Sequence, residues 1–97
     1  MTRLATFGTH VLSTSGRGRI LSMLLSGTAT DMTIAIKDAD DTEMAHWDDD
    51  ASAIATQRTG LWCGPKGIPF ANGLKIVLTD NLGGGTIEAV IEFEENP

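Results

Sequence analysis

The residues best suited to chemistry are Trp62-Cys63-Gly64-Pro65-Lys66. A Cys-x-x-Cys redox centre needs one thiolate that attacks and a second cysteine that resolves the mixed disulfide. It also needs a helix N-terminus that lowers the pKa of the first thiol. Lys66 stands where the second cysteine would be, and the Gly and Pro residues of 67–73 do not favour a helix. The stretch therefore predicts a Gly-Pro turn that follows Trp62 and Cys63 at the end of a strand.

Four acidic residues, Asp38, Asp40, Asp41 and Glu43, raise the question of a calcium site. An EF-hand loop requires Gly at its sixth position and Glu at its twelfth. Counted from Asp38, these positions hold Glu43 and Asp49, so the EF-hand template does not fit. We expect a solvated acidic turn, and calcium binding of another kind by residues 38–50 stays open.

The two histidines, His10 and His46, have no Cys or second His at metal-ligand spacing. No nucleophile-elbow sequence accompanies the many Ser and Asp residues. We therefore expect a protein that is not an enzyme and that needs no cofactor and no metal.

Basic and aromatic residues are the remaining candidates for an interface. The segment 15–19 holds the only concentrated positive charge, which makes it a candidate for an interface. The alternative interpretation is that this segment is a flexible turn. The two tryptophans permit a glycan-binding surface, although tryptophan more often lies in a core or an interface. The candidate interface residues are Arg3, Phe7, Arg17, Arg19, Trp47 and Trp62.

Length and charge limit the classes of protein. The 97 residues predict a single domain, 1–97, with one modest core. The net charge of −6 disfavours nucleic acid as a partner. A single cysteine excludes an internal disulfide, and no apolar segment is long enough for a signal peptide or a membrane span. We expect folding in a cytoplasm, with no membrane partner.

The dominant hydrophobic period is two, which indicates strands. Alternation is clearest in 86–95, and it recurs in 31–37 and 73–79. Residues 19–25 are more continuously apolar, as in a central strand, and residues 1–14 are expected to form an N-terminal arm or an edge strand. Gly, Asn and Asp turns separate these runs, including a predicted hairpin loop at 83–85. The fold expected is all-β, a single small antiparallel β-sandwich, jelly-roll-like, of about 7–8 strands.

Residues 42–57 allow two interpretations. Met44, Trp47, Ala51, Ile54 and Ala55 have the spacing of one helix face. The same segment also fits a strand at 43–47, an acidic turn at 48–50 and a second strand from about residue 54. We favour the strands, because three consecutive Asp residues are poor helix interior.

The order of the predicted strands is similar to that of a known group of proteins. An Ala29–Asp38 strand ends in an acidic turn, Ile68–Thr79 follows later, and the chain ends in an acidic strand. This order resembles the small β-sandwich virion structural proteins of tailed bacteriophages, from which the chain differs at Lys75 and in its longer acidic segment 38–50.

The resemblance implies a capsid decoration or cement subunit that binds and stabilises the head lattice. Its partners would be the major capsid protein or other virion proteins, in a homo-oligomer for which a trimer is plausible, and its location would be the virion. It implies no catalytic residues. The alternative is a tail or fibre-associated module that recognises a host surface glycan, and head and tail locations stay open.

Overall fold

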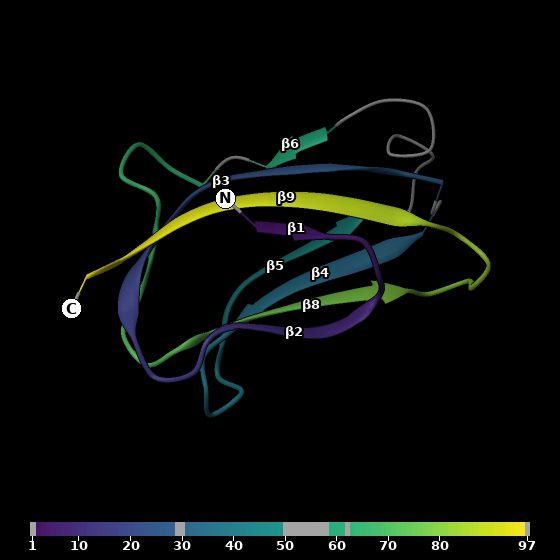
Figure 1. Ribbon diagram of the computed structural model, residues 1–97. Helices are drawn as coiled ribbons and strands as arrows, with labels where there is room; N and C mark the ends of the chain where they lie inside the picture. Colours follow the sequence, from purple (N-terminus) through teal and green to yellow (C-terminus); the bar gives the residue numbers. More distant parts are fainter. Residues whose placement is uncertain (1, 29–30, 50–58, 62, 97) are drawn as a thin grey trace.

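Two antiparallel sheets pack face to face and form the upper and lower layers in Figure 1. The computed structural model describes residues 2–28, 31–49, 59–61 and 63–96. The first sheet consists of β1 (Thr2–Leu4), β9 (Ile87–Asn96), β3 (Arg17–Gly27), β6 (Thr59–Leu61) and β7 (Ile68–Phe70). The second sheet has the order β2 (Gly8–Ser13), β8 (Leu74–Asp80), β4 (Met32–Lys37), β5 (Glu43–Asp49).

The strands pair in an order that makes the sandwich a jelly roll. β1 pairs with β9, β2 with β8, β3 with both β7 and β6, and β4 with β5. The chain therefore folds like one long hairpin that is rolled into two sheets. β7 and β6 pair with successive parts of the same edge of β3, so the nine strands of the described residues fill four positions in each sheet. The predicted all-β antiparallel sandwich is confirmed.

Alternating side chains build the core between the sheets. On β9, Ile87, Ala89 and Ile91 are buried, whereas Glu88 and Glu92 point away from the core. This is the pattern of a strand with one buried and one wet face. The largest fully buried side chains come from both sheets: Ile20, Met23, Leu25, Met32, Ile34, Ile36, Leu74, Ile76, Leu78 and Ile91. Within the described ranges there is no helix, and hence none that could cross a membrane.

The ambiguous segment 42–57 begins as a strand. β5 continues through Asp49, so the prediction of an acidic turn at 48–50 is wrong for Asp48 and Asp49. Pairing with Thr33 and Met32 of β4 extends the strand through these residues, which shows a tertiary partner overriding local propensity. The second predicted strand, from about residue 54, lies outside the described residues until β6 begins at Thr59.

The glycines at 83–85 do not form the predicted hairpin loop. β8 belongs to the second sheet and β9 to the first, so this connection crosses from one layer to the other. Asp80 holds the crossing loop, because its carboxylate accepts hydrogen bonds from the backbone N–H groups of Leu82, Gly83 and Gly85 at 3.3, 3.0 and 2.8 Å. The sequence signal for a turn was correct, but the identity of the strands it joins depends on long-range pairing.

The corner between β7 and β8 ties together the loops at one end of the sandwich. Gly73 N–H donates to the Gly16 carbonyl at 2.7 Å, and Ala39 N–H donates to the Asn72 carbonyl at 2.7 Å. The Asn72 side chain also donates to Asp40 at 3.0 Å. Asn72 and Gly73 therefore join three loops at this end of the sandwich.

Candidate interaction surface

Cys63 lies in the core, where redox chemistry is disfavoured. The residue is only 6% exposed. The Gly64–Gly67 turn and then β7 follow it, with no helix between. Burial raises the pKa of the Cys63 thiol, because the thiolate loses its hydration. A nucleophilic thiol needs the opposite shift, so the turn interpretation of this stretch agrees with the geometry.

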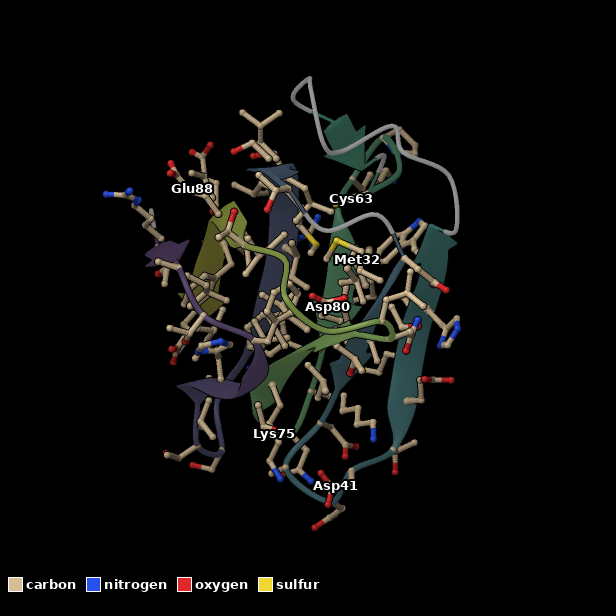
Figure 2. All side chains as sticks on the ribbon, turned by 90° about the vertical axis from the view of Figure 1, so that its right-hand side faces the viewer. Met32, Asp41, Cys63, Lys75, Asp80 and Glu88 are labelled. Carbon is tan, nitrogen blue, oxygen red and sulfur yellow. The ribbon has the colours of Figure 1, made fainter. Side chains whose placement is uncertain are left out.

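The acidic turn uses its carboxylates within the fold. Asp38 Oδ1 accepts hydrogen bonds from the backbone N–H groups of Asp40 and Thr42 at 2.9 and 3.0 Å. Asp41 Oδ1 lies 2.9 Å from Lys75 Nζ, and both side chains are at the lower end of the sandwich in Figure 2. The hydrogen bond and the charge of Lys75 lower the pKa of Asp41. These contacts stabilise a turn. Each carboxylate binds a different partner within the fold.

The histidines also have local contacts. His10 Nε2 lies 2.7 Å from the Thr6 carbonyl oxygen, and His46 Nδ1 lies 3.1 Å from Glu43 Oε1. In the part of the chain that the structure describes, no group of three or more His, Cys, Asp or Glu side chains is placed to hold a metal ion.

The outer face of the first sheet gathers apolar and charged side chains in a regular order. Leu24 of β3 is directly opposite Val90 of β9, and Val90 is opposite Arg3 of β1. Leu24 and Val90 are half-buried, and neither belongs to the core cluster between the sheets. Leu21, at a bulge in β3, is 40% exposed. We call this surface the β3–β9 face, and it comprises Arg3, Arg19, Leu21, Ser22, Leu24, Ser26, Glu88, Val90, Glu92 and Glu94.

Ion pairs lie on both sides of the apolar pair. Arg3 Nη2 is 3.0 Å from Glu88 Oε2, and Arg19 Nε is 3.8 Å from Glu94 Oε1. Arg19 also donates to the Lys66 carbonyl at 2.9 Å. Exposed ion pairs of this kind contribute about 0–1 kcal/mol to stability. They place charged groups of both signs around Leu24 and Val90.

The structure brings together only some of the predicted interface residues. Arg3 and Arg19 lie on the β3–β9 face, and exposed Arg17 begins β3 opposite Asn96. Phe7 and Trp47 are half-buried and pack against the core cluster, so they do not join this surface. Trp62 lies outside the described residues. An exposed Trp47 or Trp62 next to calcium bound by residues 38–50 would favour the glycan-binding alternative, and the half-buried placement of Trp47 does not provide this support.

Sequence reasoning missed Leu21 and Leu24 as surface residues. A signal was present in β9, where Val90 is the one apolar residue between Glu88 and Glu92 on the wet face. The corresponding signal in β3 was hidden, because residues 19–25 read as a continuously apolar central strand. The pairing of Leu24 with Val90 shows that both residues belong to one outward patch.

Comparison of the chain with models of known protein families, with curated proteins and with solved structures found no significant match.

Proposed function

We propose that the protein is a virion structural subunit that decorates a phage capsid and docks on the head lattice through its β3–β9 face. The observation that carries the proposal is the apolar pair Leu24–Val90 at the centre of an outward sheet face. Stable interfaces combine a desolvated apolar centre with a polar rim. The resemblance of residues 68–79 to virion sandwich proteins is the reason for proposing a phage capsid as the partner.

The charges of the face support docking on a partner surface. Arg3 and Arg19 present exposed guanidinium groups beside the apolar pair, each next to a carboxylate, Glu88 or Glu94, so the rim of the face offers charges of both signs to a partner. Glu92, opposite Ser22, adds negative charge beside the apolar pair. Such charges set orientation and association rate more than affinity. We therefore expect binding that weakens as salt is raised but is not abolished.

The test uses capsids assembled from the major capsid protein alone, mixed with the purified chain and sedimented. Val90→Glu places a charge at the centre of the face, and we expect about a tenfold loss of affinity or more, equivalent to about 1.4 kcal/mol. Thr79→Glu is the matched control, because Thr79 is an exposed strand residue on the outer face of the second sheet.

Both variants are first checked for an unchanged thermal unfolding midpoint. Retention of binding by Val90→Glu, or a greater loss with Thr79→Glu, would contradict docking through the β3–β9 face. Failure of the unmodified chain to sediment with capsids would contradict the decoration role itself.

A further inference from the structure

An unpaired strand edge presents N–H and C=O groups that another strand can bind, and natural proteins usually protect such edges. Among the described residues, the outer strands of this sandwich are β1 and the β6/β7 pair in the first sheet, and β2 and β5 in the second. Charges, prolines and short length are the usual protections. The four edges differ in how many of these they have.

Three of the edges are protected. β1 has three residues and includes Arg3. β6 and β7 also have three residues each, and β7 contains Pro69, which has no N–H to donate. β5 is longer but carries the exposed carboxylate of Glu43, which would repel a second acidic strand.

β2 lacks these protections. Its sequence, Gly-Thr-His-Val-Leu-Ser over Gly8–Ser13, has no proline, no lysine or arginine and no carboxylate. It pairs with β8 in regular register from Gly8 to Val11, and the register shifts only after Val11. Gly8, Thr9 and Val11 are exposed, and Val11 reaches 54% exposure, which is high for a large apolar side chain. Figure 1 shows β2 at the margin of the lower layer.

We infer that β2 pairs antiparallel with β2 of a second copy of this chain, about a two-fold axis, to join two second sheets into one continuous sheet. A second copy fits for two reasons. When a strand pairs antiparallel with its own copy, the unpaired backbone N–H and C=O groups on the two identical edges can bind each other. The two-fold symmetry then uses both edges in one contact, so the assembly stops at a dimer. The net charge of −6 opposes association wherever charged surfaces meet, and β2 is the edge where none meet.

The geometry also gives Val11 a partner. Val11 and Thr9 both lie on the outer side of the second sheet, because they pair with Lys75 and Val77 of β8. Antiparallel pairing about a two-fold axis at His10 sets Thr9 of one copy opposite Val11 of the other, so these two β-branched side chains lie beside those of the second copy, which is a favourable cross-strand combination. Since the contact consists of one short strand, we expect a dimer with a Kd that is roughly micromolar.

This inference does not rest on the proposed capsid role, and its test needs only the purified chain. Sedimentation equilibrium over a wide concentration range should show a monomer–dimer equilibrium for the unmodified protein. Val11→Lys adds a charge to the edge, and we expect at least a tenfold weaker dimer. Thr79→Lys adds the same charge away from the edge and should leave the dimer unchanged.

A second measurement locates the contact. In a Cys63→Ala background, Val11→Cys should be crosslinked between chains by a short bismaleimide. Leu82→Cys, at a 70% exposed loop residue, should crosslink much less. A monomer at every concentration would overturn the inference. So would a dimer that resists Val11→Lys, or equal crosslinking at both cysteine positions.

Discussion

At the scale of single residues, Cys63 shows how surroundings decide what a side chain can do. The tetrapeptide Trp62–Pro65 contains the first half of a redox motif, but the thiol is buried and its pKa is raised by loss of hydration. The residue that would resolve a mixed disulfide is replaced by Lys66, whose carbonyl accepts a hydrogen bond from Arg19. The sequence alone shows that the second cysteine is missing. The structure adds that Cys63 is buried, and this burial makes the thiol inert.

We predict that Cys63 reacts with a thiol-specific aromatic disulfide at pH 8 about tenfold more slowly in the native protein than in guanidinium. The raised pKa also has a consequence for stability. The folded state retains the thiol proton more strongly than the unfolded state, so the protonated thiol contributes to the stability of the fold. This contribution to stability is complete below the ordinary thiol pKa of 9.0, and it is lost as pH rises through the raised pKa of the folded state.

Cys63→Ala should remove that alkaline loss, as judged by denaturant unfolding at pH 8 and pH 10. Native labelling as fast as that of the unfolded chain would show that the thiol is accessible, and it would reopen the redox interpretation.

At the scale of elements, hydrophobic alternation was enough to predict β4, β8 and β9, because each has one face in the core. The same signal failed for the outward residues of β3. Strict alternation from buried Ile20 places Ser22 and Leu24 inside, but the bulge between Ile20 and Ser22 shifts the phase, so Met23 and Leu25 are buried instead. Loop connections could not be predicted for a related reason, since pairing of distant strands decides which layer each strand joins.

The corner at Gly73 allows a sharp test of local structure. Gly73 has a φ of 75°, and an added Cβ would lie 2.9 Å from the Ser13 carbonyl oxygen and 3.0 Å from the Ala39 Cβ. Gly73→Ala should therefore lower the free energy of unfolding by about 2–4 kcal/mol, through backbone strain and steric overlap together. Chemical denaturation monitored by tryptophan fluorescence would measure this loss.

Gly83 provides the control for that prediction. Its φ is 78°, but nothing lies within 4 Å of an added Cβ. Gly83→Ala should cost only the strain of positive φ, about 1 kcal/mol. Equal losses for the two variants would mean that close packing at the Gly73 corner contributes nothing.

At the scale of the whole molecule, the pairing of strands decides which side chains face outward and can meet a partner. The sequence predicted a sandwich, and it named Arg3 and Arg19 as interface residues, which the fold places on one outward face. It also named Phe7 and Trp47, which the fold places against the core. Aromatic residues attract attention as binding residues, yet their large apolar area also makes them core residues, and only the pairing of strands distinguishes the two roles.

The proposed decoration of a phage head is tested most directly by the copy number of this protein in gradient-purified particles of the phage that the proposal implies, or of an induced lysogen. Quantitative mass spectrometry would compare it with the major capsid protein. The proposed decoration role predicts stoichiometric abundance, comparable to the number of lattice positions on the head. A few copies per particle would contradict lattice decoration and indicate the tail or a single vertex. Complete absence from particles would contradict the virion role.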